Sequence, residues 1–191
     1  MAAGSSSRMG SPKQLLSWNG DFLILHEIQK SLSINQLTTF VILGANFEVI
    51  RREIAHMPVE ILNNENWELG MGASISFGIQ QILKGDKDFD AVLISLVDQP
   101  FIDRIHLLNL ILEFNKNQAK IIVTSDKGKS SVPAIFPQQY FNELSLLDKD
   151  YGARYIIKKY KGQISSIDGT GKTDDIDTIK DYKALLQRIK E

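Results

Sequence analysis

The sequence predicts an α/β fold in which a largely parallel sheet is covered by helices on both faces. Short runs rich in β-branched and apolar residues alternate with longer stretches in which apolar residues recur at helical spacing. This alternation is typical of βαβ units, which place parallel strands side by side and pack the connecting helices against them. The 191 residues, 43% hydrophobic and 24% charged, suit a compact domain that buries about 70% of its unfolded surface.

Six strands and seven helices are expected, each from a run of the matching period. The strands are the short β-branched or apolar runs Thr39–Leu43, Val59–Leu62, Ala91–Leu96, Ile121–Thr124, Ala134–Phe136 and Gln163–Ile167. The helices are the longer stretches with apolar residues three and four apart, Phe22–Leu32, Phe47–Ala55, Ser74–Leu83, Arg104–Asn115, Pro137–Leu147, Gly152–Tyr160 and Ile179–Lys190. The polar run Asp126–Ser131 is expected to be a mobile surface loop. Without an internal repeat or a linker, residues 1–191 are expected to form a single domain.

Composition excludes several classes of function. The 22 basic and 23 acidic residues are mixed along the chain and give a net charge of −1, so neither a nucleic-acid groove nor a polybasic membrane surface is expected. The absence of cysteine excludes disulfides, thiolate metal sites and cysteine nucleophiles, and it suits a cytoplasmic protein. The apolar runs are far shorter than the roughly 20 residues of a membrane span, so no membrane partner is expected.

The segment from Ala2 to Lys13 combines small residues, several hydroxyl groups and two cations. Gly4 lets backbone N–H groups approach an anion, and the serines that follow it add donors. Arg8 and Lys13 supply the positive charge that a polyphosphate requires. The segment therefore predicts a phosphate-binding loop. On composition alone, a solvated and flexible amino-terminal tail remains the alternative.

A nucleotide-binding loop in an α/β protein directly follows a strand, and here the loop begins at Ala2. A parallel sheet is built around its central strands, so the place of that strand is expected between the strands at Thr39–Leu43 and Ala91–Leu96. A slot between those two strands is then expected. Three explanations stay open: a longer natural chain, a misassigned start, or a version of the fold without this strand.

The same segment resembles the signature loop of the nucleotidyltransferases that share a Rossmann-like fold, in which two small residues and a glycine precede Arg8-Met9-Gly10 and a lysine. The continuation Lys13–Trp18 is most similar to the molybdenum cofactor cytidylyltransferases, whereas guanylyl-transferring relatives usually carry glycine at the position of Ala3. The resemblance implies a three-layer α/β/α fold of the nucleotide-diphospho-sugar transferase type, here without its first strand. It also implies that the nucleotide is bound by Ala2, Ala3, Gly4, Ser5, Ser6, Arg8 and Lys13.

A second glycine-containing segment, residues 66–75, resembles the family's loop against the base and ribose of the nucleotide. The resemblance implies that Gly70, Gly72 and Ser74 bind the nucleotide. Ser74 is expected to be the N-cap of a helix that begins at Ile75, so that free amides point out of a close-fitting turn. A plain capped loop is the alternative.

The expected strand Ala91–Leu96 runs into a carboxylate, Asp98, before the chain reaches Pro100. Ligands of parallel α/β sheets bind beyond the carboxyl ends of strands, so Asp98 is expected where a metal ion or a ribose sits. The family carries Asp-x-Pro here, and the resemblance implies that the aspartate coordinates magnesium. An N-cap role for Asp98 is the alternative, but Asp103 is better placed to cap the next helix.

Near the carboxyl end, residues 174–182 resemble the family's Asp-Ile-Asp-Thr-Pro-Glu-Asp-Tyr motif, with Ile179 in place of proline. The resemblance makes Asp175 the second metal ligand. Two carboxylates brought together from distant strands suit a hard ion such as Mg²⁺. Asp177 is expected instead to cap the last helix.

The resemblance implies three contacts of the second substrate, namely Gln99, Pro133 and Arg154. The family usually has Gly-His-Pro where Ser131-Val132-Pro133 stands here, so only the proline is retained and a donor is missing from the acceptor pocket. Gly152-Ala153-Arg154 resembles a helix start whose arginine meets an acceptor phosphate. An ordinary surface arginine is an equal alternative.

The resemblance as a whole implies a magnesium-dependent nucleotidyltransferase that moves CMP from CTP to the terminal phosphate of a molybdopterin-type acceptor and releases pyrophosphate. Asp98 and Asp175 would hold Mg²⁺, while Arg8 and Lys13 would neutralise the leaving pyrophosphate. A molybdoenzyme that receives the product is the expected protein partner. Because the histidine is missing, a sugar-phosphate or polyol-phosphate acceptor stays open. Because the first strand is missing, a nucleotide-binding accessory protein without turnover stays open as well.

Overall fold

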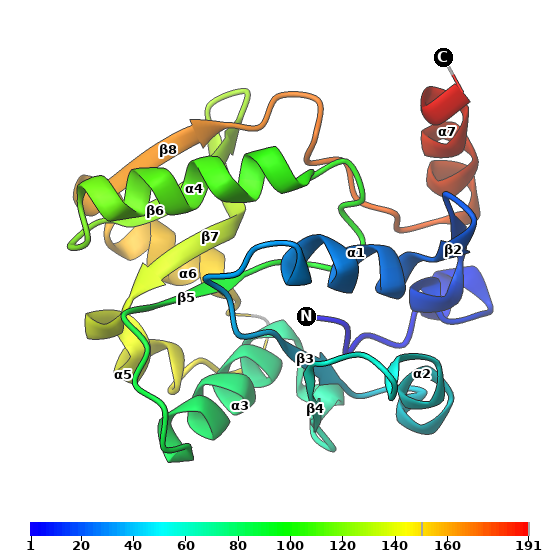
Figure 1. Cartoon of the computed structure of the whole chain (residues 1–191), viewed down its shortest axis with the longest axis horizontal. Helices are drawn as coiled ribbons and strands as arrows, with labels where there is room; N and C mark the ends of the chain where they lie inside the picture. The colour runs from blue at the N-terminus through cyan, green and yellow to red at the C-terminus, as the bar shows by residue number, and fades with distance from the viewer. Residues whose placement is uncertain (150, 191) are drawn as a thin grey trace.

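The computed structural model describes residues 1–149 and 151–190 (Figure 1). Its strands are β1 (Ser17–Trp18), β2 (Asp21–Phe22), β3 (Phe40–Leu43), β4 (Glu60–Asn63), β5 (Ala91–Ile94), β6 (Ile121–Asp126), β7 (Lys129–Pro137) and β8 (Ile164–Asp168). Its α-helices are α1 (Leu23–Leu32), α2 (Phe47–Ile54), α3 (Met71–Lys84), α4 (Arg104–Lys116), α5 (Phe141–Leu144), α6 (Ala153–Lys159) and α7 (Ile179–Lys190). No helix in this described part of the chain is long and apolar enough to cross a membrane.

The strand topology confirms an α/β fold. One sheet has the order β5, β7, β6, β8, with β6 and β8 parallel, while β7 runs antiparallel to both β5 and β6. β5, β6 and β8 therefore share one direction, and the expected largely parallel sheet is interrupted by β7. β3 and β4 form a separate parallel pair.

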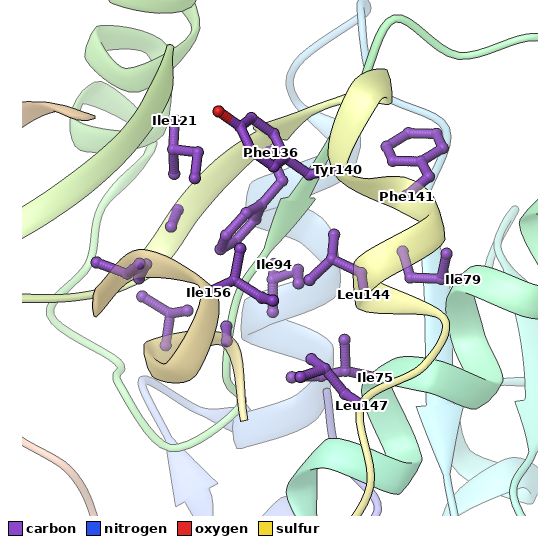
Figure 2. Close-up of a cluster of buried hydrophobic side chains, with 14 of the residues drawn as sticks. Ile75, Ile79, Ile94, Ile121, Phe136, Tyr140, Phe141, Leu144, Leu147 and Ile156 are labelled. Atoms are coloured by element: carbon purple, nitrogen blue, oxygen red, sulfur yellow. The ribbon is translucent and has the colours of Figure 1, made fainter. Parts of the chain in front are cut away.

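Helices cover both faces of the four-stranded sheet, and the alternation of side chains along its strands explains why. On β6, Ile121 and Val123 point to the face covered by α3, α5 and α6, whereas Ile122 points to the face covered by α4. On β7, Phe136 points to the face covered by α3, α5 and α6, and Ile135 points to the face covered by α4. Figure 2 shows the first of these clusters, in which Phe136 lies among side chains from α3, α5 and α6. Strands buried on both faces need continuous apolar runs, which is the pattern that made them predictable.

The prediction of a mobile loop at Asp126–Ser131 is wrong. β6 continues to Asp126 and β7 begins at Lys129, so the two-residue turn Lys127-Gly128 joins the strands. Both turn residues have positive φ, 49° and 76°, which gives a tight hairpin whose twist matches that of its strands. The polar composition suggested a loop because the tip of this hairpin is exposed to solvent.

Two further local predictions differ from the structure. The expected helix Pro137–Leu147 is broken, because pairing with β5 extends β7 through Pro137, and a 3₁₀ turn at Gln138–Tyr140 separates it from α5. The β1–β2 hairpin is absent from the predicted elements, although Asn19-Gly20 between its strands is a strong signal for a tight hairpin.

Met1 and Ala2 lie between β3 and β5, at the place predicted for a preceding strand. The Met1 ammonium donates to the carbonyl oxygen of Ser95 at 2.8 Å, and the Met1 carbonyl accepts from the Val97 N–H at 3.2 Å. On the other side, the Ala2 N–H donates to the carbonyl oxygen of Ile42 at 2.9 Å. β3 and β5 belong to different sheets, and a cavity of about 220 Å³ lies between them, as the expected slot requires.

Glu27 and Lys30 of α1 form a buried ion pair beside this cavity. Lys30 Nζ lies 2.7 and 2.8 Å from the two carboxylate oxygens of Glu27, and it also donates to the backbone oxygen of Ile102. Burial raises the pKa of Glu27 to about 7, because the loss of water disfavours the carboxylate more than the Lys30 ammonium favours it. Between the ordinary pKa of 4.5 and about 7, the folded protein holds a proton at Glu27 that the unfolded chain releases.

Glu27→Gln should change the pH dependence of stability. The favourable contribution of a protonated Glu27 is fully present below its ordinary pKa of 4.5 and is lost as the pH rises through about 7. The free energy of unfolding of the parent, minus that of the variant, should therefore fall over this range. Urea unfolding at several pH values measures it, with the exposed Glu48→Gln as control. A difference that stays constant or rises would contradict the raised pKa.

Candidate functional site

A cavity of about 370 Å³ opens beyond the carboxyl end of β5. Open α/β sheets bind ligands at this end of their strands, and the volume is in the range of small-molecule sites. The amino-terminal loop forms one wall, the segment before α3 forms the second, and the residues after β5 form the third. The predicted site residues that line it are Ala2, Ala3, Gly4, Ser5, Ser6, Arg8, Lys13, Gly70, Ser74 and Asp98.

The amino-terminal loop has the backbone geometry of an anion site. Ser6 lies in the left-handed region with a φ of 57°, and the chain then enters the 3₁₀ turn Ser7–Met9. Within the described residues, the backbone N–H groups of Gly4, Ser5 and Ser6 donate to no acceptor, and the space beside the Gly4 α-carbon is open. Successive free amides in such a loop form a concave site for anions. The loop is therefore suited to phosphate, and it is not a solvated tail.

Gln14 holds this loop in shape, and it is not among the predicted site residues. Its side chain is buried, and Nε2 donates to the backbone oxygens of Ala2 at 2.8 Å and Gly4 at 3.0 Å. The Ser6 hydroxyl accepts from the Lys13 N–H at 2.9 Å and closes the loop from the other side. A buried amide that satisfies two loop carbonyls leaves the loop N–H groups for a ligand. In the sequence its signal is weak, a polar residue directly after Lys13.

Gln14→Leu should loosen the loop while keeping the side chain close to its native size. The buried Ala2 carbonyl and the partly buried Gly4 carbonyl lose their partner, which should lower the free energy of unfolding by about 1–3 kcal/mol. Nucleotide affinity should fall about tenfold, because the loop no longer holds one shape. Urea unfolding and calorimetric titration with CTP measure the two effects, with the exposed Gln138→Leu as control. Unchanged stability and affinity would show that Gln14 does not shape the loop.

The carboxylates at the cavity are bound by cations of the same loop. Lys13 Nζ lies 2.8 Å from Asp98 Oδ2 and 3.3 Å from Asp177 Oδ1. The side chains of Lys13 and Asp98 are only 14% and 18% exposed, so water screens this pair poorly. Arg8 lies 3.9 Å from Asp177 with its side chain 72% exposed, so this contact is weak and the guanidinium can turn to a ligand.

One carboxylate oxygen of Asp98 makes no hydrogen bond within the described chain. Its Oδ1 is buried and has no hydrogen-bond partner among the described residues, which costs free energy unless a ligand meets it. A divalent cation fits this oxygen, because hard cations prefer carboxylates. The described residues contain no group of three or more acidic or histidine side chains arranged to hold an ion. The other ligands of a cation would therefore be water and phosphate oxygens, as is usual for Mg²⁺.

Asp175 lies near Asp98, although it does not line the cavity. Its Oδ1 accepts from Gln99 Nε2 at 2.9 Å, and the neighbouring Ile176 N–H donates to the backbone oxygen of Asp98 at 2.9 Å. Burial raises the pKa of Asp175 above its ordinary value, and the negative charge of Asp98 raises it further, whereas Arg154 lowers it. The structure thus brings the two predicted metal ligands into one electrostatic neighbourhood with Arg154.

Asp177 does not cap the last helix, contrary to the expectation. Thr178 is the N-cap, since its hydroxyl accepts from the Asp181 N–H at 3.2 Å and Asp181 Oδ2 accepts from the Thr178 N–H at 2.8 Å. This reciprocal pair is a capping box with aspartate in the place of glutamate. The Asp177 carboxylate is free to face Lys13 and lines the cavity, so it is a candidate site residue that the motif did not reveal.

The segment before α3 forms the opposite wall, and the helix begins earlier than predicted. α3 starts at Met71 with Gly70 as N-cap, so Ser74 lies inside the first turn and is not the cap. The Ser74 hydroxyl donates to the Gly70 carbonyl at 3.3 Å and accepts from Asn64 Nδ2 at 2.9 Å. The reason is the φ of 106° at Gly70, which suits glycine and ends the preceding 3₁₀ turn one residue before the helix.

Gly72 has a packing role that the motif did not reveal. Its N–H donates to the Lys149 carbonyl at 2.8 Å, and a Cβ there would lie 2.6 Å from the backbone oxygens of both Asp148 and Tyr151. The residue is buried outside the cavity lining. Only glycine therefore lets this chain segment pack so closely against the first turn of α3.

The three predicted acceptor contacts lie in different surroundings. Gln99 is buried and holds Asp175. Pro133 is buried in β7, where its carbonyl accepts from the Thr124 hydroxyl at 2.7 Å. Arg154 is exposed near the start of α6. As placed here, Arg154 is the one of the three whose side chain is open to a substrate.

Free amides, two cations and a carboxylate with an unpaired oxygen thus surround one cavity. The amides and the cations can bind phosphate groups. The carboxylate can bind the divalent cation that accompanies the phosphates. The arrangement is suited to binding a nucleoside triphosphate together with a divalent cation.

Comparisons with known proteins agree with this geometry. The model of a family described as "MobA-like NTP transferase domain" matches residues 1–164. A curated relative, nicotine blue oxidoreductase of Paenarthrobacter nicotinovorans, is 25% identical over 198 residues, which cover 97% of this chain and 94% of the relative.

Solved structures share the fold at low sequence identity. Rv0371c of Mycobacterium tuberculosis H37Rv superposes with a TM-score of 0.82 at 22% identity, over 97% of this chain and 95% of that one. The same protein is also known as a complex with manganese, at a TM-score of 0.75 and 20% identity, over 97% and 94% of the two chains. Molybdopterin-guanine dinucleotide biosynthesis protein A of Archaeoglobus fulgidus superposes with a TM-score of 0.64 at 15% identity, over 99% and 96% of the two chains.

Proposed function

Because this chain belongs to the MobA-like NTP transferase domain family, we propose that it transfers CMP from CTP to the terminal phosphate of a molybdopterin-type acceptor and releases pyrophosphate. The observation that carries the proposal is the cavity lined both by the amino-terminal loop, whose amides are free, and by Asp98, which has a carboxylate oxygen without a partner. Residues 1–191 act as one domain in this proposal.

In the proposed reaction, an oxygen of the acceptor's terminal phosphate attacks the α-phosphorus of CTP. A P–O bond to the acceptor forms while the bond from the α-phosphorus to the oxygen bridging the β-phosphate breaks, and that oxygen leaves with pyrophosphate. An ionised phosphate oxygen needs no general base. The protein therefore has two tasks, to align the two phosphates and to neutralise the charge that develops on the leaving group.

The amino-terminal loop performs both tasks in this proposal. The amides of Gly4, Ser5 and Ser6 bind phosphate oxygens, and Arg8 and Lys13 neutralise the leaving pyrophosphate. Asp98 and Asp175 would hold Mg²⁺, which when bound supplies positive charge shared between the nucleotide phosphates. Lys13 would then be able to turn from Asp98 to the phosphates, because the ammonium and the metal ion would compete for the Asp98 carboxylate.

The molybdopterin-type acceptor is supported by the chain after the loop, Lys13–Trp18, and by the likeness in fold to the Archaeoglobus fulgidus protein. The product would pass to a molybdoenzyme. One observation favours a second candidate. Val132 is buried where the family usually has a histidine, so a sugar phosphate or a polyol phosphate is the alternative acceptor.

Pyrophosphate release tests the choice of acceptor. The protein is incubated with CTP and Mg²⁺ and with molybdopterin, a sugar phosphate, a polyol phosphate or no acceptor. Release with molybdopterin alone is the expected result. Release with only a sugar phosphate or a polyol phosphate would show that this compound, and not a molybdopterin, is the acceptor. Tight calorimetric binding of CTP without release in any mixture would indicate a nucleotide-binding protein without turnover.

A further inference from the structure

The chain between β8 and α7 carries two carboxylates of the candidate site, Asp175 and Asp177. We call this segment, residues 169–178, the strap; it is coloured orange in Figure 1. In the described chain the strap contains no helix or strand, so its shape depends on its contacts with other elements. The residues that make those contacts therefore decide where the two carboxylates lie.

The strap is held to the rest of the molecule near both ends. Near its start, the Lys172 side chain donates to the N-cap residue of α4 and the Thr173 hydroxyl donates to the last residue of β6, each at 2.7 Å. Near its end, the fully buried Ile176 donates its N–H to the backbone oxygen of Asp98 at 2.9 Å. The placement of Asp175 then depends on what fixes the chain between these contacts.

Arg188 of α7 holds the strap at two points. Its Nη1 donates to Asp174 Oδ2 at 2.5 Å, and its Nη2 donates to the Gly171 carbonyl at 2.7 Å. Asp174 directly precedes Asp175, so the first bond acts next to the predicted metal ligand. The Arg188 side chain is 41% exposed, so the ion pair alone would add little stability. Two bonds from one planar group, however, fix direction as well as distance.

The same guanidinium also contacts the segment that carries Asp98. Its central carbon lies 4.3 Å from the centroid of the Phe101 ring, within the range of a cation–π contact. Phe101 follows Asp98 by three residues and is itself held by the buried Trp18, whose ring meets it edge-on with the centroids 5.7 Å apart. Arg188 thus joins the two chain segments that supply the predicted metal ligands.

We propose that Arg188 is a positioning residue, which fastens the strap to the Phe101 segment and thereby holds Asp175 beside Asp98 for a divalent cation. The proposal rests on the proposed function, because that function requires the cation. Among the described residues, Arg188 forms an ion pair with Asp174 and with neither predicted metal ligand, so it acts through its neighbours. Replacing a residue that orients metal ligands typically costs about 10- to 100-fold in metal affinity.

Arg188→Gln tests the proposal, with Lys159→Gln as the matched control. Lys159 likewise combines an ion pair, 2.6 Å to Glu143, with an aromatic contact, 5.1 Å to the centroid of the Tyr160 ring, and it lies outside the cavity lining. The dissociation constant of Mn²⁺ alone, measured by electron paramagnetic resonance, should rise about tenfold in Arg188→Gln and by less than about twofold in the control. Hydrogen exchange at the Ile176 amide should become about tenfold faster in Arg188→Gln only.

The metal dependence of turnover gives a further readout. In Arg188→Gln the Mg²⁺ concentration for half-maximal pyrophosphate release should rise about tenfold, whereas kcat at saturating Mg²⁺ should fall less than about threefold, because excess metal restores occupancy. Arg188→Lys keeps the charge but not the flat, forked donor, so its Mn²⁺ affinity should lie between those of the parent and Arg188→Gln. Arg188→Lys also decides the question if Arg188→Gln does not fold.

The outcomes that contradict the two proposals differ. Parental Mn²⁺ affinity in either Arg188 variant, or parental exchange at Ile176 in Arg188→Gln, would overturn the role of Arg188. An equal loss of Mn²⁺ affinity in Lys159→Gln would do the same. A parent that binds Mn²⁺ but releases no pyrophosphate with any acceptor would contradict the proposed function alone, because Mn²⁺ affinity and Ile176 exchange still decide the role of Arg188. A parent that binds no Mn²⁺ would overturn both the metal site and this role.

Discussion

Asp98→Asn should lower kcat about 10³-fold while leaving the fold intact. Asp98 lies beyond the carboxyl end of β5, accepts from Lys13 and keeps a buried oxygen without a partner. Asparagine has the same shape but no charge, so it would bind a divalent cation weakly. The lost neutralisation of phosphate charge is worth several kcal/mol in the transition state, and each 1.36 kcal/mol is tenfold in rate.

The measurement is the rate of pyrophosphate release at saturating CTP over a series of Mg²⁺ concentrations. The exposed Asp86→Asn is the matched control and should keep the parent rate. Circular dichroism and Tm should show a folded protein for both variants. If the Asp98→Asn variant kept the activity of the parent, Asp98 would not be a metal ligand.

CTP should be used about 10- to 200-fold more efficiently than GTP, because one methyl group in a close-packed site discriminates by roughly this factor. The methyl group in question belongs to Ala3, which is buried against the cavity at the position where guanylyl-transferring relatives usually carry glycine. In the proposed nucleotide complex this methyl group would narrow the space beside the base, so a purine should fit poorly.

Ala3→Gly should therefore relax the preference toward GTP. Competition of CTP against GTP in one reaction measures the ratio of kcat/KM values for the parent and the variant. Ala2→Gly is a suitable control, since Ala2 lines the same cavity and is also buried. Equal use of CTP and GTP by the parent would mean that Ala3 does not select the base.

The sequence predicted the fold well where burial dictates the residues. Ile121 and Ile122 face opposite helical layers, so both must be apolar, and the run that they form is readable without the structure. It failed where long-range pairing overrides local composition. Lys129 and Ser130 look like a polar loop, but pairing with β6 makes them part of β7.

The sequence predicted individual site residues where they belong to a recognisable motif. It did not predict the contacts between them. Lys13 and Asp98 are far apart in the chain, and only the fold places them 2.8 Å apart. Gln14 lies within the similar segment Lys13–Trp18, but its role depends on carbonyl groups that only the folded loop brings to it. Asp177 was predicted as the helix cap because the adjacent capping-box pattern, Thr178 followed three residues later by Asp181, was overlooked.

Transfer of label from CTP tests nucleotidyl transfer most directly. The protein is given Mg²⁺, the acceptor and CTP labelled with ³²P at either the α- or the γ-phosphate, and the products are separated by chromatography. The α-label should move to the acceptor, and the γ-label should appear only in pyrophosphate, at a ratio of one to one. Movement of the γ-label to the acceptor, or release of the α-label as free CMP with none on the acceptor, would contradict nucleotidyl transfer.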